Sequence, residues 1–337
     1  MFFKKDYLKK ILFYLNIANS ILILLCFILN NYYHPFFSFI SFMTFAFPVL
    51  FLINVCFLIY WTLNINVKLI LSLFILICFF YNSSDFYKIR DNTIEKKEGF
   101  HVMSFNVRLF NNYSWIENDS IAHEIKNFFE TENPDVLSIQ EYHESYKGLL
   151  NQYKYSHSHL YGNKVGQSIH TNNKIIKKGI VEFENSQNNA IYVDLLEERD
   201  TIRVYNAHFE SYKVDVQKIK ADIVTFKSII SKIKSAYLIQ KKQSKILINH
   251  IKNSPHKTIL TIDLNNTEHS FIYKEIANEL NDVFDLIGHG YGSTYNLNFL
   301  PFRIDYIFIS ESILPNYFKV YNNKLSDHKP ISSFLNI

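Results

Sequence analysis

The sequence predicts an α/β protein in which transmembrane helices precede a soluble part made of β-sheets packed face to face with helices outside. Two observations support this fold class. Long apolar segments without charge crowd the first quarter of the 337 residues. After about residue 100, short strand-like apolar runs alternate with amphipathic helical stretches, which is typical of α/β proteins.

The N-terminal quarter holds three apolar segments. Residues 11–29 and 36–61 contain no charge and are long enough to cross a bilayer. Residues 69–81 reach that length only together with residues 63–68, with Lys68 snorkelling to the interface, so the sequence leaves the third span open. A cleaved signal peptide is the alternative for the first segment, but no small-residue cleavage site follows it. We therefore predict a membrane anchor of about three helices over residues 1–81.

Lysines predict the sidedness of this anchor. Four of them precede the first apolar segment: Lys4, Lys5, Lys9 and Lys10. Because cytoplasmic loops are enriched in basic residues, the N-terminus is expected in the cytoplasm, and Lys68 in the second loop agrees. Three spans would make the chain a multi-pass membrane protein with its soluble part outside the cytoplasm.

Charge and cysteine content narrow the function of the soluble part. The first 81 residues hold five lysines and one aspartate, which leaves 30 basic and 30 acidic residues for the rest of the chain. Strong nucleic-acid binders usually carry a basic excess, so this balance argues mildly against one. Cys26, Cys56 and Cys78 all lie in apolar segments, so the soluble part has neither a disulfide framework nor a thiol nucleophile.

The soluble part reads as a linker over residues 82–99 and one domain over residues 100–337, without internal repeats. Helical segments are expected at 121–130, 213–252 and 270–280 between the strand-like runs. Residues 213–257 hold eleven lysines and two aspartates. This stretch is either a cationic face for lipid head groups or phosphates, or a solvated helix surface, and we favour the solvated surface.

Polar residues stand inside or at the ends of six strand-like runs, where burial without a partner costs roughly 1–3 kcal/mol each. They are Asn106, Glu141, Asn206, His208, Asp263, Asn265, Asp305, Asp327 and His328. Taken singly, each could be a cap or a hydrogen-bonded core residue. Because strand ends of packed sheets meet at one rim, all of them together predict one pocket.

The chemistry of these residues is consistent. Carboxylate and amide oxygens without cysteine suit Mg²⁺ or Mn²⁺. Asn206 with His208, and Asp263 with Asn265, alternate along a strand and so share a face. No nucleophile elbow, P-loop or zinc-protease motif is present. What remains is metal-assisted attack of water on a phosphorus ester.

Six motifs in order, SFNV, IQE, NAH, IDLN, RIDYI and SDHKP, resemble the endonuclease/exonuclease/phosphatase family, with the deoxyribonuclease I fold. The resemblance covers residues 100–337. It implies a four-layer α/β sandwich, two mixed sheets flanked by helices, and hydrolysis of phosphodiesters or phosphomonoesters with a divalent metal.

The resemblance also implies roles for single residues. Glu141 would be the main metal ligand, with Asn106 beside it and Asp327 at or near the metal. Asp263 would orient and deprotonate water, while Asn265 and His208, with Asn206, would hold phosphoryl oxygens. His328 would stabilise developing charge, and Asp305 would fix its imidazole. Since Asp327 and His328 are neighbours, the strand must break there for both to face the pocket.

The chain departs from the family pattern at two places. Ile262 stands where the family usually has glycine, and could narrow the site or shift its strand. The stretch SIHTNN at 168–173 replaces an apolar strand ending in a serine-basic turn, which affects substrate contacts.

Three functions compete. A lipid or small-phosphoester hydrolase and a DNA or RNA nuclease share this site, and the neutral domain favours the first slightly. A non-catalytic, membrane-tethered binding module would predict a lost carboxylate or histidine, and none is lost.

Overall fold

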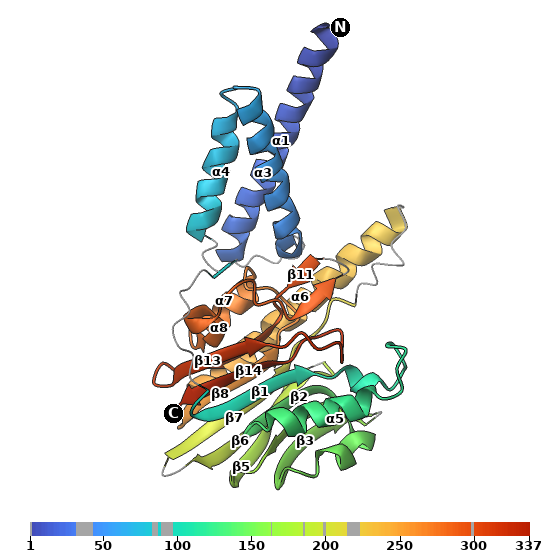
Figure 1. Cartoon of the computed structure of the whole chain (residues 1–337), viewed down its shortest axis with the longest axis vertical. Coiled ribbons are helices and arrows are strands. Elements are labelled where there is room, and N and C mark those ends of the chain that lie inside the picture. The colour runs from blue at the N-terminus through green and yellow to red at the C-terminus, as the bar shows by residue number, and fades with distance from the viewer. Residues whose placement is uncertain are drawn as a thin grey trace. The chain divides into compact units, whose positions relative to one another are not determined.

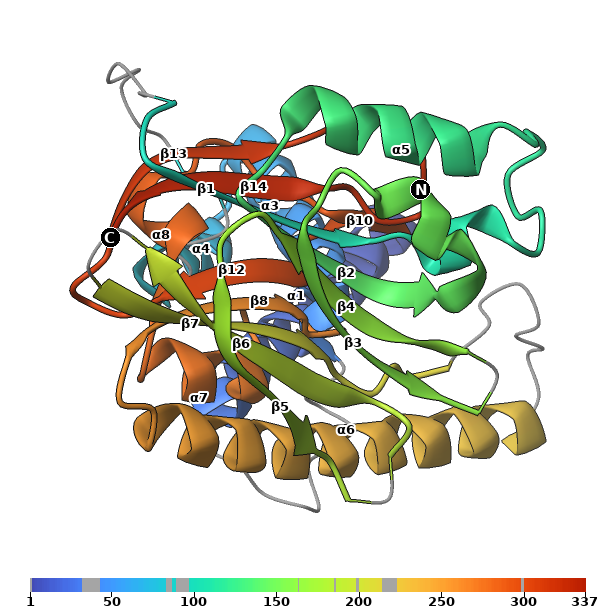
Figure 2. The same ribbon diagram turned by 90° about the horizontal axis from the view of Figure 1, so that it is seen from below.

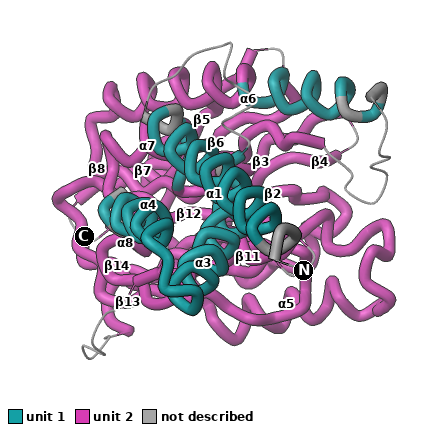
Figure 3. The backbone as a smooth tube through the Cα atoms, turned by 90° about the horizontal axis from the view of Figure 1, so that it is seen from above, with its two compact units in different colours: residues 1–86, 214–237, 269–271 teal, residues 87–213, 238–268, 272–337 magenta. Residues whose placement is uncertain are grey.

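The computed structural model (Figure 1) describes residues 2–31, 43–82, 87–88, 97–162, 164–184, 186–197, 200–213, 223–297 and 300–337. Much of the predicted linker, and residues 214–222 of the lysine-rich stretch, lie outside these ranges. The chain divides into two compact units, drawn in different colours in Figure 3. The first comprises residues 1–86, 214–237 and 269–271, and the second comprises residues 87–213, 238–268 and 272–337.

The first unit is helical. It contains α1 (Phe2–Asn31), the short 3₁₀ helix η2 (Met43–Ala46), α3 (Phe47–Leu63), α4 (Leu69–Asn82) and the first half of α6 (Ile223–Lys252). Among the described helices, only α1 is long and apolar enough to cross a membrane, over Asp6–Ile28. The apolar parts of α3 and α4 are shorter, Phe47–Leu63 and Leu69–Phe79. Helix length and composition therefore support one candidate span and do not support the predicted multi-pass anchor.

Polar side chains lie between the helices of this unit. Asn16 on α1 donates to the hydroxyl of Ser72 on α4 over 2.9 Å, and Asn54 on α3 donates to the Ser72 carbonyl over 3.0 Å. All three residues are fully buried. Beside them packs an apolar cluster that includes Ile23, Phe47 and Phe79. The interior of the unit thus combines hydrogen-bonded amides with apolar contacts.

The second unit contains two six-stranded sheets. The first has the order β13 (Leu314–Val320), β14 (Ile331–Asn336), β1 (Phe100–Asn106), β2 (Val136–His143), β4 (Val165–Thr171) and β3 (Tyr155–Tyr161). The second has the order β5 (Ile175–Glu182), β6 (Asn189–Glu197), β7 (Asp200–His208), β8 (Lys257–Asp263), β12 (Asp305–Ile309) and β9 (Asn281–Asp282). Both are mixed, since β1–β2 and β7–β8 are parallel and the other pairs are antiparallel.

Alternation of apolar residues along the strands builds the core between the two sheets. Val102 and Ile331 from the first sheet meet Val204 and Ile259 from the second in one buried cluster. On the outer face of the first sheet, α5 (Ile121–Glu132) packs through an apolar stripe that includes Phe129. This stripe follows from apolar residues at helical spacing.

Helices cover the outer face of the second sheet as well. The part of α6 within this unit contacts it, because the Tyr205 hydroxyl on β7 lies 2.8 Å from Nδ1 of His250. The short helices α7 (Phe271–Ala277) and α8 (Val283–Ile287) follow β8, and two 3₁₀ helices, η3 (Arg108–Asn111) and η4 (Glu144–Leu150), follow β1 and β2. Figure 2 shows α5 and α6 on opposite sides of the paired sheets. The predicted sandwich of two mixed sheets flanked by helices is confirmed.

The strand β8 runs regularly at the position where the family usually has glycine. Ile262 is fully buried and pairs in register with Ala207 of β7 and Tyr306 of β12. Ile262 is therefore accommodated without a break in the ladder on either side of β8. The same registers bring the ends of β7, β8 and β12 to one rim, because His208 and Asp305 both lie opposite Asp263.

Candidate active site

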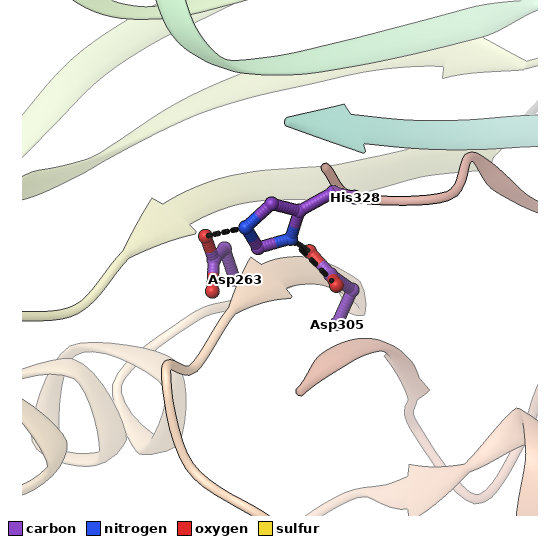
Figure 4. Close-up of side chains that lie close together, drawn as sticks. All are labelled: Asp263, Asp305 and His328. Carbon is purple, nitrogen blue, oxygen red and sulfur yellow. Dashed lines mark hydrogen bonds and ion pairs between the residues drawn. The ribbon is translucent and has the colours of Figure 1, made fainter. Parts of the chain in front are cut away.

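Three buried side chains form the centre of the rim cluster, as Figure 4 shows. Asp263 ends β8 and Asp305 begins β12, and the two residues are paired across the antiparallel ladder. His328 comes from the loop before β14 and inserts its ring between them. Its Nδ1 lies 3.0 Å from Oδ2 of Asp305, and its Nε2 lies 3.9 Å from Oδ2 of Asp263. The two ring nitrogens therefore each face a carboxylate.

The charge of His328 follows from these neighbours. Burial alone would lower the pKa of the imidazole, but the carboxylates of Asp305 and Asp263, together with the hydrogen bond that Nδ1–H donates to Asp305, raise the pKa well above its usual value. The two carboxylates therefore favour the protonated form of the buried imidazole.

The strand breaks at Asp327 and His328 as the sequence predicted. Residues 325–327 form a bend rather than a strand. Ser326 Oγ donates to Oδ1 of Asp327 over 3.1 Å and accepts the backbone N–H of His328 over 3.3 Å. Asp327 is partly exposed and forms an ion pair with Arg108 at 3.2 Å, whereas His328 turns inward.

Glu141 and Asn106 approach the cluster from the first sheet. Asn106 ends β1, and the ladder between β2 and β4 is irregular between Ile139 and Tyr142. Within this irregular stretch, Glu141 has a left-handed backbone with φ of 50°, a conformation that is rare outside glycine and typical of functional sites. Asn106 Nδ2 donates to Oδ2 of Asp263 over 2.8 Å and to Oε1 of Glu141 over 3.3 Å. Asn106 therefore connects the two sheets at the rim.

His208 and Asn265 flank Asp263. Nε2 of His208, at the end of β7, lies 3.4 Å from Oδ2 of Asp263. The backbone N–H of Asn265 donates to Oδ1 of Asp263 over 3.0 Å, and its Nδ2 donates to the Phe209 carbonyl over 3.1 Å. Both carboxylate oxygens of Asp263 are thus held in fixed directions.

Asn206 lies beneath the rim rather than at its surface. It is fully buried between the sheets, and its Nδ2 donates to the carbonyls of Ile139 and Ser168 over 2.9 Å each. Its Oδ1 accepts from Gln140 over 2.7 Å. Because its amide is engaged by the core, this position differs from the predicted contact with a substrate phosphate. Asn206 instead ties β7 to β2 and β4, directly below His208 and Glu141.

The structure adds two residues that the sequence analysis did not single out. Arg108 pairs with Asp327, and its guanidinium lies 4.5 Å from the Trp115 ring centroid. Tyr295 stands 5.1 Å from His328 between ring centroids. Burial raises the pKa of Tyr295, and the carboxylates of Asp327, Asp263 and Glu141 raise it further, while Arg108 opposes them. The pKa of the Tyr295 phenol is thus raised by carboxylates from both sheets, Glu141 on β2 and Asp263 on β8.

A local signal existed for only one of these two residues. Arg108 is a charged residue directly after the motif SFNV, so its proximity to Asn106 was accessible from the sequence. Tyr295 begins the short hairpin of β10 (Tyr295–Leu297) and β11 (Leu300–Phe302). The sequence around Tyr295 contains no motif or periodicity that would identify it as a site residue.

The donors at the rim fit a hard divalent cation. Asp263, Asp305 and His328 lie close enough together to hold an ion. However, a protonated imidazole has no lone pair to offer, which argues against His328 as a ligand. Glu141 supplies a half-exposed carboxylate, and carboxylate oxygens are what Mg²⁺ and Mn²⁺ prefer. Asn106 directs its nitrogen at the carboxylates while its Oδ1 accepts from the Arg108 N–H, so ligation by its oxygen would require the amide to rotate.

Comparisons with known structures agree with this fold. The chain is similar to the endonuclease/exonuclease/phosphatase from Bacteroides vulgatus, with 15% identity, a TM-score of 0.56, and coverage of 72% of this chain and 100% of that one. It is also similar to a mannosyl-6-phosphatase from Bacteroides thetaiotaomicron, with 17% identity, a TM-score of 0.52, and coverage of 71% and 100%. A humanized D. rerio TDP2 gives 17% identity, a TM-score of 0.55, and coverage of 71% and 99%. No curated protein matches the chain in sequence.

The sandwich and the acidic rim define a protein with the fold of phosphoesterases and nucleases. Residues 103–328 match the Endonuclease/Exonuclease/phosphatase family. Because this match covers more than half of the chain, the protein belongs to that family. Residues 9–86 match a second family, described as a domain of unknown function (DUF8431).

Proposed function

We propose that this protein is a divalent-metal-dependent phosphoesterase that hydrolyses a phosphodiester or phosphomonoester by in-line attack of water. The observation that supports this most directly is the buried imidazole of His328 between the carboxylates of Asp305 and Asp263, which favour its protonated form. A fixed cation is what the phosphoryl transition state needs, because negative charge develops on its oxygens.

Each side chain has a role in this proposal. Asp263 orients the attacking water and accepts its proton, since Asn106 and the Asn265 N–H hold the carboxylate in place. His208 and the second amide N–H of Asn265 bind phosphoryl oxygens. His328 stabilises the charge that develops as the ester bond breaks, and Asp305 keeps the imidazole oriented and protonated.

Glu141, with Asn106 and Asp327 near it, would hold Mg²⁺ or Mn²⁺. When bound, such a cation neutralises negative charge on a phosphoryl oxygen. Asp327 also forms an ion pair with Arg108. This ion pair would hold the Asp327 carboxylate on the side of the pocket where the metal binds.

The test uses the full-length protein in detergent, with p-nitrophenyl phosphate and bis(p-nitrophenyl) phosphate as minimal monoester and diester. We expect turnover with Mg²⁺ or Mn²⁺ and none in excess chelator. A panel of duplex DNA, RNA, phospholipid vesicles and small phosphate esters then separates the hydrolase of lipids or small esters from a nuclease. A non-catalytic binding module would turn over nothing on the panel.

We further propose that the first unit anchors the chain in a membrane. Supporting this, the polar residues Asn16, Asn54 and Ser72 of α1, α3 and α4 are buried, while apolar side chains cover most of the outer surface of these three helices. Exposed apolar side chains include Tyr14, Leu15, Ile21, Ile28, Leu52, Ile59, Ile70, Phe74 and Ile77. In water, such a distribution would leave a large apolar surface hydrated. In lipid it is favourable, because amides between helices act as polar contacts in a bundle.

The ends of the helices agree with this orientation. Lys68 Nζ, in the turn between α3 and α4, lies 4.5 Å from the Phe13 ring centroid and 5.0 Å from that of Trp61. This lysine and the predicted cytoplasmic lysines therefore stand at the same end of the helical unit. Under this proposal the catalytic domain is outside the cytoplasm, and protease added to intact spheroplasts digests it without lysis.

A further inference from the structure

A pocket of about 410 Å³ opens directly beside the proposed site. Glu141 and His208 line it, together with the polar side chains of Tyr161, Gln167, Gln187 and Asn188 and the apolar side chains of Leu109 and Val165. Its volume lies within the roughly 300–1,000 Å³ that is typical of small-molecule sites. A phosphate held between Glu141 and His208 would therefore direct its ester group into this pocket.

The polar residues that line the pocket are nearly all uncharged. Apart from Glu141 and His208, its hydrogen-bonding side chains are three amides and one phenol, and no described lining residue is Lys or Arg. Neighbouring phosphates of a polynucleotide or a polyphosphorylated ligand would need such cations. The described lining therefore favours an uncharged group over one with further phosphates.

Among the lining residues, Gln167 gives the most direct indication that the pocket binds a ligand. It is 2% exposed, and its Oε1 has no hydrogen-bond partner among the described residues. Gln167 and Ile169 share one face of β4, since side chains alternate along a strand, and Ile169 belongs to the apolar core between the sheets. An unpartnered amide oxygen at this depth costs roughly 1–3 kcal/mol, and a ligand hydroxyl would satisfy it.

The turns that flank the pocket leave room for such a ligand. Gly162, between β3 and β4, has φ of 23°, and a Cβ added there would meet no heavy atom within 4 Å. Gln187 and Asn188 precede β6 and so come from the other sheet. The pocket therefore offers amide donors and acceptors from both sheets, a combination that suits hydroxyl groups, because each hydroxyl both donates and accepts.

We propose that this pocket binds an uncharged, hydroxyl-rich leaving group, so that the substrate is a phosphate ester of a polyol ring such as a hexose or an inositol. The inference rests on the proposed phosphoesterase function and adds the substrate class to it. A soluble sugar phosphate and an inositol lipid head group share this chemistry, and the experiment below distinguishes the two sources.

The test compares the full-length wild type with Gln167→Met, which keeps the length of the side chain and removes its amide. The matched control is Gln152→Met. Both side-chain polar atoms of Gln152 are buried without a partner among the described residues, and Gln152 does not line the pocket. Substrates are a hexose 6-phosphate, vesicles containing phosphatidylinositol, a short oligonucleotide, and p-nitrophenyl phosphate, whose leaving group offers no alcohol hydroxyls.

We expect Gln167→Met to lower kcat/KM for the polyol ester about tenfold, the effect of one or two lost hydrogen bonds. We expect less than a twofold change for p-nitrophenyl phosphate, and Gln152→Met to behave as the wild type on both. Turnover of the hexose ester or of the lipid identifies the source of the ring. Equal losses on both substrates, or preference for the oligonucleotide, would overturn the inference.

If no ester is turned over, the proposed phosphoesterase function is wrong. A binding measurement then tests separately whether the pocket recognises a polyol. Calorimetric titration of hexose 6-phosphate in excess chelator should give tighter binding than inorganic phosphate in the wild type. The advantage should disappear in Gln167→Met and persist in Gln152→Met. If inorganic phosphate binds the wild type as tightly as the sugar ester, the pocket does not recognise a polyol.

Discussion

At the scale of single residues, His328 and Asp305 depend on each other. Both are buried, and Nδ1 of the imidazole lies within 3.1 Å of both carboxylate oxygens. Removal of either partner leaves the other as a buried group without its counterpart, which is costly for a charge. Their contributions to catalysis should therefore not be additive.

We predict that His328→Ala lowers kcat by roughly 10²-fold or more, the loss expected for one transition-state donor. Asp305→Asn keeps the shape and removes the charge, so it should also lower kcat. The double variant should be little worse than His328→Ala, because the residues act as a unit. The measurement is kcat for all four proteins at saturating metal, with circular dichroism to verify the fold. Losses that multiply in the double variant would mean that the pair is not functional.

Glu141 is predicted to govern metal binding. Glu141→Gln removes one negative charge from a half-exposed position, so the fold should be retained while affinity for Mn²⁺ falls at least tenfold. Electron paramagnetic resonance of free Mn²⁺ measures this without turnover. Glu144→Gln, an exposed acid three residues away, is the control. Unchanged Mn²⁺ affinity in Glu141→Gln would assign the metal to other side chains.

The sequence predicted those site residues that lie in or next to recognisable strand-like runs. Asp263, Asp305 and His328 were identified this way, and they do meet at the rim. Asn206 was placed on the correct face, but a strand pattern does not say how deep a residue lies, and its amide is engaged by Ile139 and Ser168 of the other sheet. Tyr295 depends on how a loop folds back, which leaves no periodic signal.

At the scale of elements, apolar runs identified the central strands, including β1, β2, β7, β8 and β12. The edge strands β3, β5 and β13 were not predicted. Their sequences YSHSHLY, IIKKGIVE and LPNYFKV mix polar residues or proline into the run. Edge strands bear such residues because one side of the ladder is not paired and their faces are partly wet.

The strand β4 carries a group that makes stability depend on pH. His170 is buried, with ring centroids 5.9 Å from those of Tyr142 and Tyr153. Burial lowers the pKa of His170 to about 4, and Lys147 adds to this effect. In the unfolded chain the pKa is about 6.5. Between these values only the unfolded chain binds the proton.

The free energy of unfolding should therefore be largest above about pH 6.5 and fall as the pH drops toward 4, with this residue accounting for about 3 kcal/mol. Urea unfolding of the wild type and His170→Phe at pH 7.5 and pH 4.5 measures it, and the variant should lose less stability on acidification. His123→Phe, on the exposed side of α5, should keep the dependence of the wild type. Identical slopes in the wild type and His170→Phe would contradict the assignment.

At the scale of the whole molecule, the first and second units bury different kinds of group. In the sheets, apolar side chains fill the interior and charged residues gather at the rim. In the helical unit, amides lie inside together with apolar side chains, and apolar side chains also cover the outside of α1, α3 and α4. These two arrangements are what the proposed anchor requires, with water around the second unit and lipid around the helices α1, α3 and α4 of the first.

The cysteines of the helical unit allow this difference to be tested. Cys26 is buried, whereas Cys56 is exposed on the surface of α3. If that surface faces lipid, the Cys56 thiol meets no water, so a charged maleimide should not reach it in open membrane fragments. After denaturation in sodium dodecyl sulfate it should be labelled fully. Ser145→Cys, at an exposed position of the second unit, serves as the accessible reference in the same membranes, since open fragments expose both sides. Labelling of Cys56 as fast as that of Ser145→Cys would place α3 in water. Protection of Cys56 together with rapid labelling of the reference would extend the membrane-embedded part beyond α1, the one described helix that passes the test of length and composition.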